Sequence, residues 1–293
     1  MNTILVTGGK GQLGIELQRA VWPEGWQVHA IDIDELDLTD SAAIAAAVEA
    51  QPYAAIISGG AYTAVDKAED DQVTAWAVNA LAPAALAAAA KKAGIPIVQV
   101  STDYVFDGAN PGQRRPDEPT APKNVYGASK LGGELAVRSS GACYAIVRTA
   151  WVVSAHGNNF IKTMLRLAET RDELTVVDDQ HGAPTAAADL AQALVRVTVA
   201  LVDGRPSGIW HLANSGETVW ADFARAIFAG SAVRGGPSAR VKGIPSSDYP
   251  TPAARPAWSQ LDTSDFTRDF GLTPRPWQDA LDDILDELIG PKQ

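Results

Sequence analysis

A glycine-rich stretch near the start of the chain, residues 8–14, constrains the fold more than any other feature. It follows a short apolar run and precedes a stretch with helical character. In a strand–turn–helix unit, Gly8 can take the tight turn, Gly11 lets the backbone approach a pyrophosphate, and Gly14 lets helix and strand pack closely. The free N–H groups at the start of such a helix favour phosphates. The stretch therefore predicts a dinucleotide site, with a glycine-rich turn that binds nothing as the alternative.

The residue that ends the second predicted strand supports the dinucleotide interpretation. Residues 27–31 read as a strand, and Asp32 follows it. An acidic residue about 20 positions after the glycines hydrogen-bonds the adenosine ribose in dinucleotide-binding folds. Its charge would repel a 2′-phosphate, which favours NADH, although an acid after a strand is common in any turn. We expect Asp37 and Leu38 to lie where the adenine ring rests.

The order of predicted elements defines the fold class. Strands and helices alternate over the first 150 residues or so, which is typical of an α/β chain with a Rossmann-type, doubly wound parallel sheet. Beyond that point the pattern is mixed. We predict a dinucleotide-binding domain over residues 1–150, to which later segments at about 174–213 return. The remainder, residues 151–293, is predicted to be mainly a smaller C-terminal substrate-binding domain.

Composition excludes several classes of protein. The chain has 24 Lys and Arg against 35 Asp and Glu, a net charge of −11, which argues against a nucleic-acid partner. A single cysteine, Cys143, forms no internal disulfide, and the four histidines show no metal-ligand spacing, so no metal ligands are assigned. The N-terminal run is too short for a signal peptide, and no membrane-spanning run is evident. We expect a cytoplasmic protein without a membrane partner.

A tyrosine and a lysine in the first half suggest the chemistry. Tyr126 and Lys130 are four positions apart, so on a helix they share one face. A nearby ammonium lowers the pKa of a phenol, and a tuned tyrosine can protonate a carbonyl oxygen while a nicotinamide supplies hydride. Thr102 or Ser101, after a predicted strand, could hold that oxygen in line. The alternative is a surface pair without function.

These motifs occur together in a known family. The chain resembles the extended short-chain dehydrogenase/reductases and, within them, the dTDP-4-dehydrorhamnose reductase family, over nearly its whole length. The blocks that carry the resemblance are GQLG (11–14), TAVDKAE (63–69), STDYVFDG (101–108), VYGxxK (125–130), RTxWV (148–152), GNNF (157–160), DQxGxPT (179–185) and PTPAxRP (250–256).

The resemblance implies roles for individual residues. It makes Tyr126 the acid, Lys130 its tuner and ribose clamp, and Thr102 the catalytic hydroxyl. NADPH or NADH would be bound by the glycines and by Gln12, Leu13, Asp32, Asp37, Leu38, Ala61, Tyr62, Thr63, Tyr126 and Lys130. The sugar nucleotide would be bound by Thr102, Asp103, Trp151, Asn158, Gln180 and Arg255, with Arg255 as the candidate partner for pyrophosphate charge.

The implied activity is reduction of the C4 keto group of dTDP-4-dehydro-6-deoxy-L-mannose to dTDP-L-rhamnose. Two alternatives stay open. One is another NAD-dependent nucleotide-sugar enzyme, an epimerase or a dehydratase; the other is a non-catalytic, nucleotide-binding regulatory subunit of the same fold. Some relatives bind magnesium at a dimer contact. A homodimer and a Mg²⁺ ion therefore also stay open, although no motif here requires them.

Overall fold

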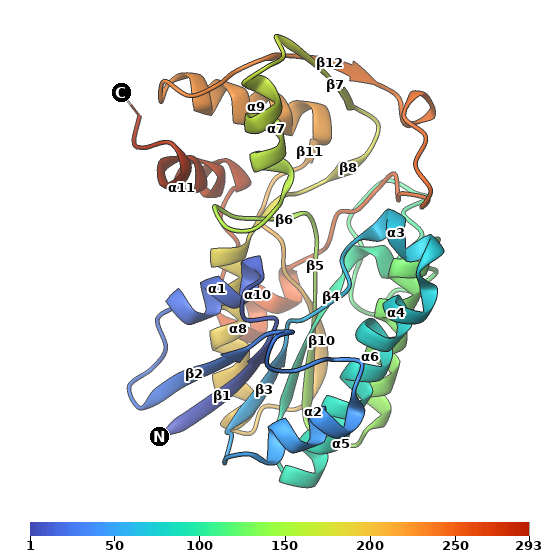
Figure 1. The fold of residues 1–293 in the computed structure, drawn as a ribbon, viewed down its shortest axis with the longest axis vertical. Coiled ribbons are helices and arrows are strands. Elements are labelled where there is room, and N and C mark those ends of the chain that lie inside the picture. Colours follow the sequence, from blue (N-terminus) through green and yellow to red (C-terminus); the bar gives the residue numbers. More distant parts are fainter. Residues whose placement is uncertain (293) are drawn as a thin grey trace.

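The computed structural model describes residues 1–292, and its larger half is built on a six-stranded sheet (Figure 1). All strand pairs in this sheet are parallel, in the order β10-β5-β4-β3-β1-β2. The strand order reverses beside β1, which creates a crevice at the carboxyl ends where such folds bind ligands. The strands are β1 (Asn2–Thr7), β2 (Trp26–Ile31), β3 (Ala55–Ser58), β4 (Ile97–Thr102), β5 (Tyr144–Thr149) and β10 (Gly208–His211). The predicted fold class is confirmed.

Helices cover both faces of the sheet (Figure 1). Along β1, Ile4 and Val6 pack into the cluster that contains Leu190 and Leu194, whereas Leu5 packs on the other face with Leu86. Both faces are thus dry, which explains why the strands read as nearly continuous apolar runs. One face carries α1 (Gln12–Arg19), α8 (Ala187–Val202) and α10 (Ser264–Phe270), and the other carries α2 (Ser41–Glu49), α5 (Ala82–Ala93) and α6 (Val125–Ser139).

Capping residues set two helix boundaries on the second of these faces. The Asp40 carboxylate accepts hydrogen bonds from the N–H groups of Ala42 and Ala43 and so caps α2. At the other end of this layer, α5 stops at Gly94, which has a left-handed φ of 70°.

The helical stretch from residue 72 to residue 93 is not uniform. It consists of α4 (Gln72–Trp76), a π-helical turn (Ala77–Leu81) and α5, with Pro83 in the first turn of α5. Because proline cannot donate the hydrogen bond that a continuous α-helix needs, the irregular turn precedes it. By length and composition alone, the stretch Gln72–Ala93 could cross a membrane. Leu86, Ala87 and Ala90 are fully buried against the sheet, as in the core helix of a globular protein.

The smaller half has a separate hydrophobic core. Its main elements are α7 (Phe160–Ala168), β7 (Glu173–Val177), α9 (Trp220–Ala232), β12 (Arg240–Ile244) and α11 (Trp277–Leu288). Short strands complete it and join it to the sheet: β6 (Val152–Val153), β8 (His181–Gly182), β9 (Thr185–Ala186) and β11 (Thr218–Val219). Helix α3 (Val65–Asp70) packs against α4 and α6 in the larger half.

One segment differs from the expected domain organisation. Of the stretch at about 174–213 that was predicted to return to the nucleotide-binding half, α8 and β10 do pack there. By contrast, β7 pairs in parallel with β12 in the smaller half. An apolar run of four or five residues indicates a buried strand, but it does not indicate which strand it pairs with. The sequence therefore could not assign β7 to either half. The domain boundary near residue 150 stays a prediction.

Candidate active site

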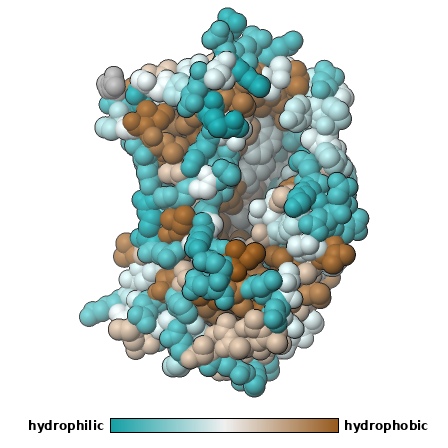
Figure 2. All heavy atoms as spheres, in the orientation of Figure 1, coloured by the Kyte–Doolittle hydropathy of each residue, from teal (hydrophilic) through white to brown (hydrophobic). Residues whose placement is uncertain are grey.

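A cavity of about 1150 Å³ lies where the carboxyl ends of the sheet strands meet the smaller half. Figure 2 shows the molecule hollowed between these two parts. Residues from both halves line the cavity, including all five residues of the loop after β3, 59–63, and the turn after β1. This is the crevice predicted from the strand order, and it is large enough for a dinucleotide with a second ligand.

The glycines of this turn allow close backbone contacts that a side chain would block. Gly8 has a φ of 77°, and a Cβ there would lie 2.8 Å from Gly60. A Cβ on Gly14 would lie 2.1 Å from the Gly8 carbonyl oxygen. Gly11 begins α1 without a side-chain cap, so the first N–H groups of the helix are left for a ligand. The cradle fits a pyrophosphate.

Asp32 lies at the rim of this cradle. Its carboxylate accepts hydrogen bonds from the backbone N–H groups of Lys10 (2.7 Å) and Ile33 (2.8 Å). The Lys10 ammonium pairs with Asp34 at 2.6 Å, so a cation also stands at the ribose end of the cavity. The backbone contacts fix the Asp32 carboxylate in a position that can accept ribose hydroxyls.

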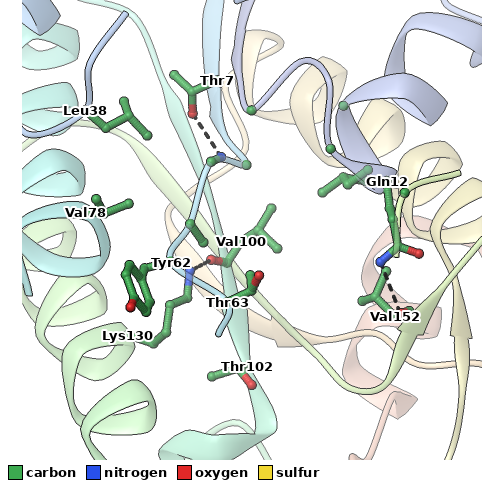
Figure 3. Close-up of a pocket in the computed structure, with 18 of the residues that line it drawn as sticks. Thr7, Gln12, Leu38, Tyr62, Thr63, Val78, Val100, Thr102, Lys130 and Val152 are labelled. Atoms are coloured by element: carbon green, nitrogen blue, oxygen red, sulfur yellow. Dashed lines mark hydrogen bonds between the residues drawn. The ribbon is translucent and has the colours of Figure 1, made fainter. Parts of the chain in front are cut away.

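The remaining predicted cofactor residues also line the cavity: Gln12, Leu13, Asp37, Leu38, Ala61, Tyr62 and Thr63. Several are labelled in Figure 3. The Asp37 carboxylate is occupied by the N–H and hydroxyl of Thr39, both at 2.8 Å, and these contacts lower its pKa. The Tyr62 hydroxyl donates to Asp71 at 3.1 Å.

Gln12 links the glycine turn to the smaller half. Its Oε1 accepts hydrogen bonds from the Ser154 hydroxyl (3.0 Å) and the Asn159 amide (2.9 Å), and its Nε2 approaches the Val152 carbonyl at 3.5 Å (Figure 3). A residue that sequence identified only through family resemblance thus has a structural reason to be an amide.

The predicted catalytic pair lies on α6, which the Asn124 side chain caps through the Gly127 N–H at 2.7 Å. The Lys130 ammonium donates to the Val100 carbonyl at 2.7 Å and reaches the cavity wall (Figure 3). Burial lowers the pKa of Lys130 to about 8, and the Glu134 carboxylate acts in the opposite direction. Tyr126 also lines the cavity, with its ring edge-to-face against Tyr104 at 5.5 Å.

The pKa of Tyr126 shifts in the direction opposite to the one expected from a nearby ammonium. Burial raises the pKa of Tyr126 to about 12, the Thr102 side chain opposes this through hydrogen bonding, and the charge of Asp103 adds to it. Lys130 is not among the groups that shift the pKa of Tyr126, and its ammonium donates to the Val100 carbonyl. In this state the phenol keeps its proton at neutral pH.

Thr102 is the last residue of β4, Asp103 follows it, and both line the cavity. The Thr102 hydroxyl donates to Asp103 Oδ1 at 2.9 Å and accepts from the Tyr104 N–H at 3.2 Å. Asp103 is only 3% exposed, and its Oδ2 has no hydrogen-bond partner within residues 1–292. Burial raises the pKa of Asp103 to about 6.

The four other predicted substrate residues separate into two groups. Trp151 and Asn158 line the cavity. Gln180 and Arg255 are not part of its wall: Gln180 donates to the Ser246 hydroxyl at 2.9 Å, and Arg255 makes two hydrogen bonds of 2.7 Å to Asp66. The structure therefore does not bring these two side chains to the cavity, because other polar groups already occupy them.

Several wall residues were not predicted as site residues, among them Trp220, Gly59 and Gly60. Trp220, from α9, stacks on Trp151 with ring centroids 3.7 Å apart. In the sequence, a tryptophan at the start of a helix is typical of core packing. The position of Trp220 in the cavity wall becomes visible only in the folded structure. Gly59 and Gly60 follow β3 and approach the glycine turn, with the Gly60 N–H donating to Thr7 Oγ1 at 3.2 Å (Figure 3). Their position after a strand was the available signal.

One cluster outside the cavity has metal-ligand chemistry that sequence spacing did not show. Glu16, His156 and Glu287 offer donor atoms within 4.8 Å of one another. The Arg19 guanidinium lies among them, 2.7 Å from Glu287 Oε1 and in contact with the His156 ring. Because a cation already neutralises this cluster, it gives the magnesium alternative no support.

Comparison with known proteins shows which family this chain resembles. The family model described as "RmlD substrate binding domain" matches residues 1–289. The chain is 41% identical to the dTDP-4-dehydrorhamnose reductase of Escherichia coli (strain K12), over 98% of both chains, and 40% identical to that of Sinorhizobium fredii, over 94% of both.

Solved structures with the same fold match nearly the full length of the chain. The dTDP-4-dehydrorhamnose reductase of Bacillus anthracis in complex with NADP matches 98% of this chain and 100% of its own, with a TM-score of 0.90 and 35% identity. The UDP-glucose 4-epimerase of Brucella ovis in complex with NAD has a TM-score of 0.82 but 19% identity, over 99% of both chains, and supports the fold alone.

Proposed function

The chain belongs to the RmlD substrate binding domain family, and from that premise we propose that it reduces the C4 keto group of dTDP-4-dehydro-6-deoxy-L-mannose to dTDP-L-rhamnose. One observation carries the proposal. Thr102, Tyr126 and Lys130 line the same cavity as the pyrophosphate cradle, so a proton donor faces the space beside a cofactor. The relatives that match nearly the full chain carry the name of this reductase.

The cofactor is a reduced nicotinamide dinucleotide. The glycine turn and the first N–H groups of α1 would hold its pyrophosphate, Asp32 would accept from the adenosine ribose, and Lys130 would donate to the nicotinamide ribose. When bound, the nicotinamide supplies a hydride to a carbonyl carbon. Asp32 favours NADH, whereas the Lys10 ammonium and the NADP-bound relative from Bacillus anthracis favour acceptance of NADPH as well.

The chain's own groups complete the reduction. The Tyr126 hydroxyl is protonated at neutral pH, since burial shifts its pKa further above the usual value of 10, and it can transfer its proton to the oxygen that becomes the C4 hydroxyl. The Thr102 hydroxyl, which donates to Asp103 in this structure, would turn its proton toward that oxygen to hold it. The Lys130 ammonium would then favour the phenolate that remains, since a nearby positive charge stabilises it.

Two other activities use a similar site. An epimerase or dehydratase would keep its nicotinamide cofactor through the cycle, so consumption of one NAD(P)H per sugar separates these enzymes from a reductase. A non-catalytic regulatory subunit would bind the dinucleotide without turnover. The presence of all three catalytic side chains around one cavity favours an enzyme over a regulatory subunit. A homodimer and a cytoplasmic location stay predictions.

Replacement of Tyr126 tests the proposal. Tyr126→Phe keeps the ring that packs against Tyr104 but removes the proton, so we expect turnover to fall by about 10²-fold or more, as for loss of a general acid. The measurement is NAD(P)H oxidation with the dTDP-keto-sugar made in situ, alongside titration of cofactor binding. Cofactor affinity should stay within about twofold of wild type. Wild-type turnover by the variant would overturn the role of Tyr126.

A further inference from the structure

Among residues 1–292, Trp151 is the one non-glycine residue with a left-handed backbone conformation. Its φ is 49°, and every other residue with positive φ in that range is glycine. Bulky residues adopt this region only when their surroundings impose it, and such residues concentrate at functional sites. Trp151 lies between β5 and β6, where the chain leaves the main sheet for the smaller half.

Two residues of the smaller half contact the Trp151 indole. Trp220 stacks on it with ring planes 12° apart and centroids at 3.7 Å. Gly182 lies under its edge, and a Cβ at that position would come within 2.7 Å of the indole carbons. Phe160 in turn packs against Trp220, with ring centroids 4.6 Å apart. The indole therefore occupies a slot that the smaller half provides.

The slot opens on the cavity, since Trp151 and Trp220 both line it. We propose that Trp220 and Gly182 are positioning residues that hold the Trp151 indole in its strained conformation at the wall of the sugar site. The sugar-binding part of this inference rests on the proposed function. Without the stack and the space at Gly182, the Trp151 backbone would relax to an ordinary conformation and the indole would leave the wall.

A rigid indole suits this place in the cavity. A 6-deoxy sugar has an apolar methyl group and C–H faces, and a large flat ring offers them contact area at low conformational cost. The main sheet supplies the indole while the smaller half sets its orientation. Sugar affinity then depends on Trp220 even where Trp220 makes no polar contact with the ligand.

The first experiment follows the indole pair itself. Stacked indoles at this distance couple in circular dichroism, so Trp220→Leu and Trp151→Leu should each remove the same near-ultraviolet signal, and the double variant should remove little more. Trp76→Phe is the matched control, because Trp76 is partly exposed and is not part of the cavity wall. Additive spectral losses from the two single variants would overturn the proposal.

The second experiment measures sugar binding. In Trp220→Leu we expect the KM for the dTDP-keto-sugar to rise about five- to tenfold, the worth of one aromatic pair, with cofactor affinity unchanged. Trp220→Phe retains a stacking ring and should recover most of the wild-type KM. A wild-type KM in Trp220→Leu, or an equal rise in Trp220→Phe, would overturn the positioning role.

Gly182→Ala provides an independent variant. Gly182 is not in the left-handed region, so alanine changes the available space and not the backbone strain. We expect the same spectral loss as in Trp220→Leu, and an unchanged spectrum would overturn the role of Gly182. If the wild-type protein does not reduce the keto-sugar, the proposed function fails, but the spectra still decide whether Trp220 and Gly182 hold Trp151.

Discussion

Burial sets the protonation states of three side chains at the floor of the cavity. It raises the pKa of Asp103 and of Tyr126 and lowers that of Lys130. Each shift favours the neutral form, which is the expected effect of removing water from an ionisable group. The site thus holds its proton on the phenol at neutral pH, and the sequence motif alone, which suggested a lowered phenol pKa, could not show that burial dominates.

The raised pKa of Asp103 predicts a pH-dependent stability. The folded carboxyl binds its proton up to about pH 6, whereas in the unfolded chain it releases it near its usual value of 3.8. Its contribution to stability is therefore present below pH 3.8 and is lost as the pH rises through about 6. A shift of about two pKa units corresponds to about 3 kcal/mol. Asp103→Asn cannot ionise and should not lose this free energy.

The measurement is urea unfolding of wild type and Asp103→Asn at several pH values. We expect the stability of the variant relative to wild type to increase between pH 4 and pH 8, by up to about 3 kcal/mol. Asp71→Asn, at a half-buried carboxylate whose pKa is lowered, should show no such increase. A constant difference between Asp103→Asn and wild type across this range would mean that Asp103 is not buried as an acid.

At the residue scale, sequence predicted the groups that act locally. Asp32, Tyr126 and Thr102 follow from a strand end or a helix spacing, and the fold brings all three to one cavity. What sequence missed depends on contacts between distant segments. Arg255 looked like a free cation for a diphosphate, but Asp66, 189 positions away, binds it.

At the element scale, the packing of α1 against the turn after β1 depends on Gly14. Because an alanine Cβ would lie 2.1 Å from the Gly8 carbonyl oxygen, Gly14→Ala must push the start of α1 away from the strand. We expect a loss of about 1–3 kcal/mol in unfolding free energy, as for other overpacked sites. Cofactor affinity should fall by about tenfold or more, because the N–H groups of α1 leave their positions.

Gly11→Ala is the matched control. A Cβ at Gly11 would meet only the Gly8 oxygen, at 3.3 Å, and the φ of Gly11 is −73°, so the fold should tolerate alanine. We expect Gly11→Ala to unfold like wild type and yet to bind NAD(P)H more weakly, because the methyl group stands where the pyrophosphate approaches. Thermal unfolding and cofactor titration measure both effects. Equal stability of Gly14→Ala and Gly11→Ala would contradict the packing role of Gly14.

Elements were predictable where their residues define their surroundings. The strands of the main sheet are largely apolar, and the first four along the chain are each followed by a helix, so their type and order along the chain follow from sequence. The partner of β7 does not follow, because β12 has no such signature: Arg240 and Lys242 alternate with small or apolar residues in an irregular stretch. The π-helical turn before Pro83 was equally hidden.

At the scale of the whole molecule, the two halves meet around the cavity through a few defined contacts. Gln12 reaches Ser154 and Asn159, and Trp151 enters the slot at Trp220. A further contact joins the loop containing Arg255 to the larger half. The same loop is held at Asn124, whose amide donates to the Ala254 carbonyl at 2.7 Å and which lies two positions before Tyr126 at the start of α6. The position of this loop is thus coupled to the catalytic helix.

The Asp66–Arg255 pair distinguishes two roles for this loop. Arg255 makes two hydrogen bonds of 2.7 Å to Asp66 on α3, and its guanidinium holds the pKa of that carboxyl below its usual value. If the pair fastens the loop beside the sugar site, Asp66→Ala and Arg255→Ala should both raise the KM for the dTDP-keto-sugar. Their effects should not add, with a coupling of about 1 kcal/mol because Asp66 is partly exposed.

If Arg255 instead binds the diphosphate directly, as its sequence block suggested, Asp66→Ala would release the guanidinium and lower the KM, while Arg255→Ala would raise it. Steady-state kinetics of the two single variants and the double variant therefore separate the two roles by the sign of the Asp66→Ala effect. We expect a rise, because the guanidinium makes two hydrogen bonds to Asp66 and lies outside the cavity wall. Cofactor affinity should be unchanged in all three variants, since neither residue contacts the glycine turn or the Asp32 rim.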